Sequence, residues 1–337
     1  MILLSIFLGI SIFLPIYTYA VYPYVLKLFP NKVLREDSSY QPNVSIVIVR
    51  NEGVPISHKV ENIAISEYPA VEEVLIADNY ESACGLLYNV KGEIVVITDS
   101  SSQYKYDTIS RLISPLSDKR IGCVCGMSRK PTGENGQSTD GLIWRYENQI
   151  KILESNIGTL SGANPAVYAV RSQLIPEKIP TSIKLDFFIP TFVTEMGYDV
   201  VFQPNAVAYE VAQRDNKNLF RIHVLDGSSA YRSIVCFWKL LLPRKGSFVF
   251  WSHRVLKWLV PFNLMVVLFC SMLLAINSRI FMFFTAIQIV SYIYILLYHY
   301  LYVAKNKQMG GIIGKISEFT CYFFTLNLAW LLGLFKK

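Results

Sequence analysis

The sequence predicts an α/β domain built on a mixed, mainly parallel sheet and joined to apolar segments long enough to cross a membrane. Of the 337 residues, 52% are hydrophobic and only 17% are charged, which is too apolar for a soluble domain of this length. The apolar excess lies at the two ends of the chain. Between them, three short apolar runs each finish in acidic or amide side chains, as the strands of a ligand-binding α/β domain do.

The first 26 residues contain no charged side chain. At about 1.5 Å per residue, a helix of this length crosses a hydrocarbon core of about 30 Å. Thr18, Tyr19 and Ala20 resemble a signal-peptide cleavage site, but a signal peptide has a basic residue ahead of a shorter apolar core. We therefore expect residues 1–28 to form a retained transmembrane helix, followed by a charged linker at 29–41.

Three strands are predicted after the linker. Residues 94–97 form an unbroken β-branched run, typical of a strand buried on both faces, and lead into Asp99 and three serines. Residues 43–52 and 71–77 predict two further strands, the second followed by Asp78, with a short helix at 60–66 between them. Open α/β folds bind ligands at the carboxyl ends of their parallel strands. The alternative is that these acidic residues only form turns.

The C-terminal part contains apolar runs at residues 255–276, 280–303 and 316–335. The basic residues beside the ends of the apolar segments all fall on one side of the membrane if the middle of the chain is cytoplasmic. This charge distribution favours a cytoplasmic location for residues 42–230. Lys336 and Lys337 then lie on the outer side, so the last run either spans the membrane or re-enters it. We expect about three transmembrane helices within residues 255–337. The net charge of +7, gathered at the membrane flanks, requires no nucleic-acid partner.

Residues 231–254 mix aromatic side chains, among them Trp238 and Trp251, with basic side chains such as Lys239 and Arg244. This mixture is typical of an amphipathic segment lying in the membrane interface. Such a segment would hold the preceding domain against the bilayer. A helix packed beneath that domain is an equally good interpretation.

The chain resembles membrane-embedded, polysaccharide-synthase-like family 2 glycosyltransferases with the GT-A fold. The resemblance extends from Pro42 to Pro261, about two thirds of the chain, and depends on the order and spacing of several short motifs. These lie at residues 44–52, 73–78, 92–102, 120–126, 162–171, 184–190, 197–206 and 252–261.

The resemblance implies a role for individual residues on the donor side. Glu52 and Asp78 would contact the nucleobase and ribose, and Asp99 would serve the nucleotide and a divalent cation. Arg221 occupies the place of a basic residue over the diphosphate, where a cation offsets the charge of the leaving group. Asp186 falls at the place of the catalytic carboxylate and would be the base of an inverting displacement. The alternatives are that Asp78 and Asp99 form turns and that Arg221 faces lipid headgroups.

On the acceptor side, the resemblance implies that Gly162, Asn164 and Tyr168 lie near the donor sugar and the acceptor. Small residues there allow close approach of a ligand, although the same residue types also favour a simple turn.

The sequence departs from the family pattern at the metal motif, where Ser101 replaces the usual second aspartate. One strong oxygen ligand is thereby replaced by a neutral one, so Mg²⁺ or Mn²⁺ would bind weakly. Leu185 replaces the acidic residue that precedes the catalytic aspartate. The stretch between Asp78 and Asp99 is also shorter than usual, by about a strand and a helix.

Two hypotheses follow. The first is an inverting glycosyltransferase of the hexosyltransferase type (EC 2.4) in the plasma or bacterial inner membrane. It would move a sugar from a nucleotide-sugar, of which a UDP-sugar is our first choice, to a lipid-linked or growing polysaccharide acceptor. The second is a degenerate glycosyltransferase fold that binds or scaffolds a polysaccharide assembly complex. A transporter is disfavoured because the apolar spans carry almost no ionisable residues. Oligomers or partner subunits are compatible with both hypotheses.

Overall fold

The computed structural model describes residues 1–51, 53–129, 139–210, 219–303 and 309–336. These residues divide into two compact units. The first unit described below comprises Val25–Arg214 and Arg232–Trp251, and contains the sheet. The second comprises Met1–Tyr24, Asp215–Tyr231 and Ser252–Lys337, and contains the apolar helices.

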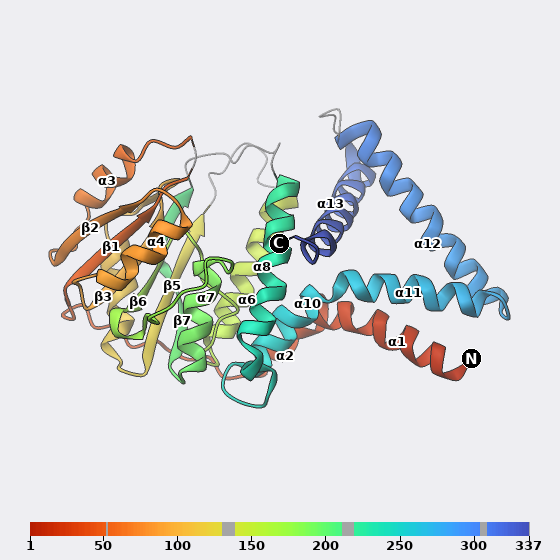
Figure 1. Ribbon diagram of the computed structural model, residues 1–337, viewed down its shortest axis with the longest axis horizontal. Coiled ribbons are helices and arrows are strands. Elements are labelled where there is room, and N and C mark those ends of the chain that lie inside the picture. The colour runs from red at the N-terminus through yellow and green to blue at the C-terminus, as the bar shows by residue number, and fades with distance from the viewer. Residues whose placement is uncertain (52, 130–138, 211–218, 304–308, 337) are drawn as a thin grey trace. The chain divides into compact units, whose positions relative to one another are not determined.

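The described part of the first unit is built on a mixed sheet with the strand order β2-β1-β3-β6-β5-β7-β4 (Figure 1). The strands are β1 Val44–Val49, β2 Val71–Ala77, β3 Ile94–Asp99, β4 Ser102–Tyr104, β5 Ile121–Arg129, β6 Tyr168–Arg171 and β7 Asp199–Glu210. The pairs β1–β2, β1–β3 and β5–β7 are parallel, whereas β3–β6, β5–β6 and β4–β7 are antiparallel. The sheet is therefore mixed and mainly parallel, as expected: β2, β1, β3, β5 and β7 run in one direction, and β6 and β4 run in the other.

The predicted strands at 43–52, 71–77 and 94–97 correspond to β1, β2 and β3. Every residue of β3 is buried, as the β-branched run predicts for a strand covered on both faces. β2 lies at the edge of the sheet, and Val74 and Ile76 on it are 37% and 42% exposed. Its apolar composition did not distinguish an edge strand from a central one.

Helices cover this sheet and connect its strands. They are α3 Ser57–Ala64, α4 Tyr80–Leu86, α5 Thr108–Ile113, α6 Thr139–Ser155, α7 Leu185–Glu195 and α9 Ser247–Val249. α4 packs on β1 and β2, and α7 packs on β5, β6 and β7; both lie in front of the sheet in the view of Figure 1. α4 begins directly after β2 because Asn79 caps it, accepting a 2.8 Å hydrogen bond from the Ser82 amide.

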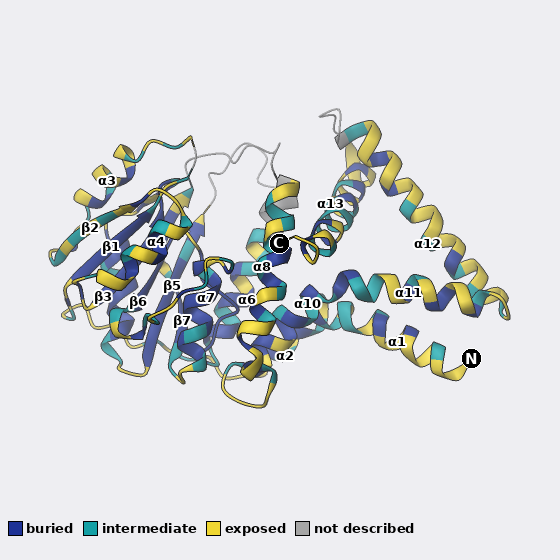
Figure 2. Ribbon diagram, viewed as in Figure 1, coloured by how far each residue is buried: buried dark blue, intermediate teal, exposed yellow. Residues whose placement is uncertain are grey.

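The second unit consists of helices. They are α1 Ile2–Ile16, α2 Tyr22–Leu26, α10 Leu256–Trp258, α11 Val260–Ala275, α12 Arg279–Tyr298 and α13 Gly311–Gly333; α8 Leu219–Cys236 runs from this unit into the first. α1 packs along α11 through Leu8, Val267, Cys270 and Leu274. Most other apolar side chains of α1 and α12 face outward, including Ile280 at 78% and Phe283 at 65% exposure (Figure 2).

Within the described residues, two helical segments are long and apolar enough to cross a membrane, namely Ile2–Leu26 and Arg279–Tyr302. The pair Ser247–Trp258 and Val260–Ala275 adds a third if this pair, bent by 55°, is one span. α13 is not among these spans, and Lys315 and Glu318 lie in its first half. The expected total of three C-terminal spans is therefore not confirmed.

Candidate active site

The carboxyl ends of β1, β2 and β3 meet at one edge of the sheet. Val49 on β1 lies opposite Ala77 on β2 and opposite Asp99 on β3. Asp78, which follows β2, and Asp99, which ends β3, therefore lie on either side of the end of β1.

Asp78 lies at the open rim of this edge. Its side chain is 73% exposed, and its Oδ1 is 3.2 Å from a guanidinium nitrogen of Arg50. The Arg50 amide donates to the carbonyl of Ala77, so the backbone that carries the pair is held by the sheet. Both charges remain accessible to a ligand.

Asp99 lies deeper in the same edge and is only 7% exposed. The turn after it is fixed by Asn51, whose amide N–H donates to Ser100 Oγ at 2.9 Å and whose side chain donates to Ser101 Oγ at 2.8 Å. Asp99 Oδ1 is buried and has no hydrogen-bond partner among the described residues. A buried carboxylate oxygen without a partner is uncommon, and a bound ligand or ion is one way to satisfy it. Glu52, predicted to contact the nucleobase, lies outside the described residues.

Lys59 is a residue of this edge that the sequence did not indicate. It lies on α3, has no exposed surface, and places its Nζ 3.2 Å from Ser102 Oγ and 3.5 Å from the centre of the Tyr104 ring. Burial lowers the pKa of Lys59 to about 7, and the negative charge of Asp99 opposes this shift. Burial likewise raises the pKa of Tyr104, and the charge of Asp99 adds to that increase. Helical lysines are usually solvated, so periodicity alone gave no reason to single this one out.

Asp186 is the second residue of α7 and is partly exposed. Pro190 lies four residues further on and lacks the N–H that would bond to the Asp186 carbonyl. That carbonyl instead accepts a 2.6 Å hydrogen bond from the Ala163 amide. Because of this proline, the Asp186 carbonyl at the start of α7 is free to bind the loop that contains the predicted acceptor residues.

Two tyrosines connect Asp186 to the edge that carries Asp78 and Asp99. Tyr80 follows Asp78 by two residues and donates its hydroxyl to the carbonyl of Ile183, three residues before Asp186. Tyr168 begins β6 opposite Ile97 of β3, so its side chain lies on the same face of the sheet as Asp99. Burial raises the pKa of both tyrosines, and the negative charge of Asp186 adds to both shifts.

The three predicted acceptor residues are all buried. Gly162 has φ 142°, a conformation that favours glycine. Asn164 is 8% exposed, donates to the Gly126 carbonyl at 2.5 Å, and accepts a hydrogen bond from Lys151. The hydroxyl of Tyr168 is buried without a hydrogen-bond partner in the described part of the chain. An acceptor role for these residues stays a prediction. The side-chain amide of Asn164 already has a structural role, because it is hydrogen-bonded to Gly126 and Lys151.

Arg221 lies on α8 within the unit of apolar helices, whereas Asp78, Asp99 and Asp186 belong to the unit that contains the sheet. Its predicted position over a diphosphate stays a prediction.

The residues around Asp99 do not form a metal site by themselves. The described residues contain no group of three or more histidine, cysteine, aspartate or glutamate side chains that could hold a metal ion. Asp99 supplies one carboxylate, Ser101 supplies only a neutral hydroxyl, and Lys59 places a cation nearby. Mg²⁺ and Mn²⁺ favour several carboxylate or phosphate oxygens, so this set does not fit a cation held by the protein alone.

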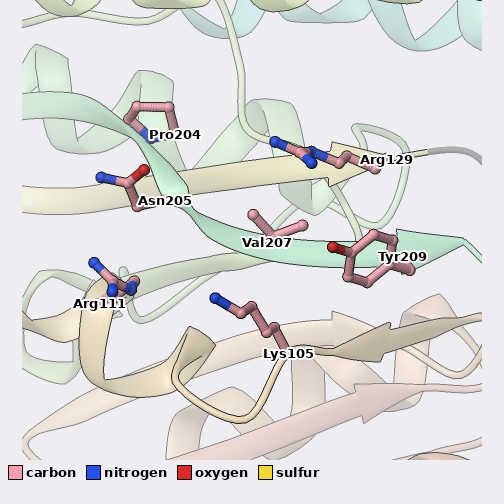
Figure 3. A pocket seen from close by; sticks show the side chains of 7 residues that line it. All are labelled: Lys105, Arg111, Arg129, Pro204, Asn205, Val207 and Tyr209. Carbon is pink, nitrogen blue, oxygen red and sulfur yellow. The ribbon is translucent and has the colours of Figure 1, made fainter.

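A hollow of about 270 Å³ lies next to the β4–β7 pair, away from the predicted site residues (Figure 3). Asn205, Val207 and Tyr209 reach it from alternate positions of β7, and Arg129 reaches it from the end of β5. Lys105 and Arg111 complete the lining, but both form ion pairs with Asp107 at 3.5 and 2.5 Å. Asp107 therefore compensates one of the three positive charges that line this hollow.

A mixed sheet with acidic side chains at or just after the carboxyl ends of β2 and β3 is the arrangement expected of the GT-A fold. A solved structure that matches almost the whole chain agrees with this assignment. A mannosyltransferase, PcManGT from Pyrobaculum calidifontis, in complex with GDP-Man and Mn²⁺, superimposes with a TM-score of 0.72 at 15% identity. The alignment covers 98% of this chain and 99% of that one, so the likeness includes the apolar helices.

A glucosyl-3-phosphoglycerate synthase from Mycobacterium tuberculosis, in complex with Mg²⁺ and UDP, gives a TM-score of 0.38 at 13% identity and covers 61% of this chain and 84% of its own. No family model and no curated protein matches the sequence. At 15% identity the match to the mannosyltransferase shows the fold alone, and the chain has the GT-A fold.

Proposed function

We propose that the protein is a membrane-bound, inverting glycosyltransferase of family 2 that transfers a sugar from a nucleotide-sugar to a lipid-linked or growing polysaccharide acceptor. The observation that carries the proposal is the buried side chain of Asp99, whose Oδ1 has no hydrogen-bond partner among the described residues, at the strand edge of a GT-A fold. A UDP-sugar is the first donor to test. GDP-sugars belong in the same assay, because GDP-Man is bound in the mannosyltransferase that shares the fold.

The donor would lie along the edge formed by Asp78, Arg50 and the turn after Asp99. Asp78 and Glu52 would take the ribose and base, as the family resemblance implies. Asn51 fixes Ser100 and Ser101 through two hydrogen bonds, so the turn is already organised before a ligand arrives. Arg221 would meet the diphosphate and offset its growing negative charge as the leaving group departs.

Asp186 would act as the base. Its carboxylate would accept the proton of an acceptor hydroxyl while that oxygen forms a bond to the anomeric carbon and the bond to the nucleoside diphosphate breaks. Three observations support this role: the partial exposure of Asp186, its backbone bond to Ala163, and its electrostatic coupling to Tyr80 and Tyr168. The loop of Gly162, Asn164 and Tyr168 would border the acceptor.

The membrane supplies the acceptor in this proposal. Two apolar helices are long enough to anchor the chain, and the segment after α8 exposes Trp238 (55%), Leu242 (52%) and Trp251 (39%) beside basic residues. Such a surface suits a membrane interface. Phe237 of the same segment is buried against Phe187 and Phe188 of α7, so the segment is also packed on the sheet unit. We propose the cytoplasmic face of the plasma or bacterial inner membrane as the location.

A second function is favoured by one observation. Asp99 is the sole carboxylate of the described metal motif, which agrees with a degenerate domain that binds or scaffolds a polysaccharide assembly complex. Such a subunit would bind nucleotide weakly or not at all, and it would not transfer sugar.

The experiment that separates these functions is sugar transfer by the purified protein, using radiolabelled UDP- and GDP-sugars with membrane lipid present. The enzyme proposal predicts labelled product from wild type and a loss of at least about 100-fold in turnover for Asp186→Asn, with nucleotide affinity unchanged. Glu195→Gln, at the other end of α7, is the matched control and should keep its activity. Absence of product with every donor, or full activity of Asp186→Asn, would contradict the assignment.

A further inference from the structure

The buried lysine beneath the strand that follows Asp99 is unusual in its surroundings. Lys59 contacts a hydroxyl, Ser102 Oγ, and an aromatic face, that of Tyr104, and it is fully enclosed. An ammonium group in such a place requires a negative partner, because an uncompensated buried charge is strongly unfavourable. Ser102 Oγ, which Lys59 contacts, also donates to the Asp99 carbonyl at 3.3 Å, so the ammonium group lies beside the turn that Asp99 begins. The negative charge of Asp99 opposes the fall in the pKa of Lys59.

Lys59 is not needed to hold β4 in position. Asn62, one turn further along α3, already binds the backbone of Tyr104 twice, donating to its carbonyl at 2.9 Å and accepting from its amide at 2.6 Å. Ile63 on the same face of the helix is buried in the core beneath the sheet. An apolar side chain of similar length at position 59 would fill the same space without a charge.

The charge balance of the turn follows from these contacts. Asp99 contributes one negative charge, Ser100, Ser101 and Ser102 contribute none, and Lys59 contributes one positive charge. Glu52 lies outside the described residues and is not part of this balance. The turn and its lysine are therefore neutral together, whereas a divalent cation held by protein oxygens needs net negative charge around it.

We propose that Lys59 is the internal counter-charge of Asp99, so that the empty donor site does not retain a divalent cation and the cation reaches it only together with the diphosphate of the nucleotide. This inference rests on the proposed donor site. The diphosphate oxygens supply the negative charge that the turn lacks. Lys59 acts through Asp99 and is a positioning residue, not a catalytic one.

The test is Mn²⁺ binding by the full-length protein in detergent at pH 6.5, followed through the electron paramagnetic resonance signal of free Mn²⁺, with and without UDP or GDP. Wild type should show no saturable site for Mn²⁺ alone and one site when nucleotide is present. Lys59→Met should bind Mn²⁺ without nucleotide about 10- to 100-fold more tightly than wild type, since a nearby unit charge changes ionic equilibria by that order.

Three further variants keep the test decisive. Ser101→Asp adds a carboxylate at a partly exposed position and should also create a nucleotide-independent Mn²⁺ site, even if Lys59→Met does not fold. Lys105→Met removes a positive charge directly after β4 that is already paired with Asp107, and it should behave as wild type. Adding Asp99→Asn to Lys59→Met should abolish the gained site.

The inference is overturned if wild type binds Mn²⁺ equally well with and without nucleotide, or if folded Lys59→Met binds it no better than wild type; should Lys59→Met not fold, failure of Ser101→Asp to gain a site overturns it. A lysine with a purely structural role would leave Mn²⁺ affinity unchanged on removal. If neither UDP nor GDP adds a Mn²⁺ site to wild type but the two variants gain one, the counter-charge stands and the proposed donor site fails.

Discussion

One carboxylate anchors two distant segments to the start of β7, and its removal should measurably destabilise the sheet unit. Asp199 Oδ2 is 2.6 Å from the Nζ of Lys32 in the linker, and its Oδ1 is 2.7 Å from the Nζ of Lys245 in the segment after α8. The Asp199 side chain is 14% exposed, and the lysine side chains are 30% and 36% exposed. Both interactions are hydrogen bonds between full charges, partly shielded from water.

Asp199→Asn keeps the shape of the side chain but turns one of its two acceptors into a donor that faces a lysine. A hydrogen bond to a charged group contributes about 1.5–3 kcal/mol, and the partial exposure of the lysines argues for the lower part of that range. We expect a loss of about 2–4 kcal/mol in the free energy of unfolding. For a unit of this size that corresponds to a fall of about 5–10 °C in the thermal midpoint.

The assay is thermal unfolding in detergent, followed by tryptophan fluorescence. Asp37→Asn is the matched control, because Asp37 is exposed and its carboxylate accepts hydrogen bonds from its near neighbour Ser39. Those bonds are solvated, so their loss should lower the midpoint far less. A midpoint for Asp199→Asn within about 1 °C of wild type, or equal falls for both variants, would refute the reasoning.

The difference in stability between wild type and Asp199→Asn should also depend on pH. Burial raises the pKa of Asp199, but the hydrogen bonds and charges of Lys245 and Lys32 outweigh it and hold the pKa below its ordinary value. A lowered carboxyl pKa contributes stability above the ordinary range of the group and loses it as the pH falls through the lowered value. The difference between wild type and Asp199→Asn should therefore be largest near pH 7 and shrink towards pH 3.

Further predictions concern packing and a buried charge. Gly92→Ala should destabilise by about 1–3 kcal/mol, because its Cβ would lie 2.4 Å from the Ser45 amide nitrogen; Gly85→Ala on α4, with open space around it, should match or exceed wild type in thermal midpoint. Lys59 has its pKa lowered to about 7 by burial, so the unfolded chain binds more protons above that pH. Wild type should accordingly gain stability relative to Lys59→Met between pH 6 and pH 9, and parallel profiles would contradict the burial of its charge.

The sequence predicted the parts of the fold that local pattern controls. The β-branched run at 94–97 identified a fully buried strand, and the acidic ends of the early strands identified the edge where they meet. Pro190 also carried a usable signal, since a proline four residues after Asp186 frees the carbonyl that holds Ala163.

What local pattern does not encode was missed. The antiparallel direction of β6 and the edge position of β2 depend on pairings between residues far apart in the chain. Lys59 is a lysine on a short amphipathic helix, which ordinarily points to water, and only the tertiary contact with β4 buries it. The acidic side chains were visible in the sequence, whereas the cation that balances one of them was not.

Nucleotide binding at the strand edge is a direct measurement of the proposed donor site. Isothermal titration of UDP and GDP, with Mn²⁺ present, would compare wild type with Asp99→Asn and with Asp118→Asn, whose carboxylate lies before β5, away from that edge. The account predicts saturable binding of at least one nucleotide to wild type and Asp118→Asn, and an affinity at least about tenfold lower for Asp99→Asn. No binding of either nucleotide at millimolar concentration, or equal affinity in all three proteins, would contradict it.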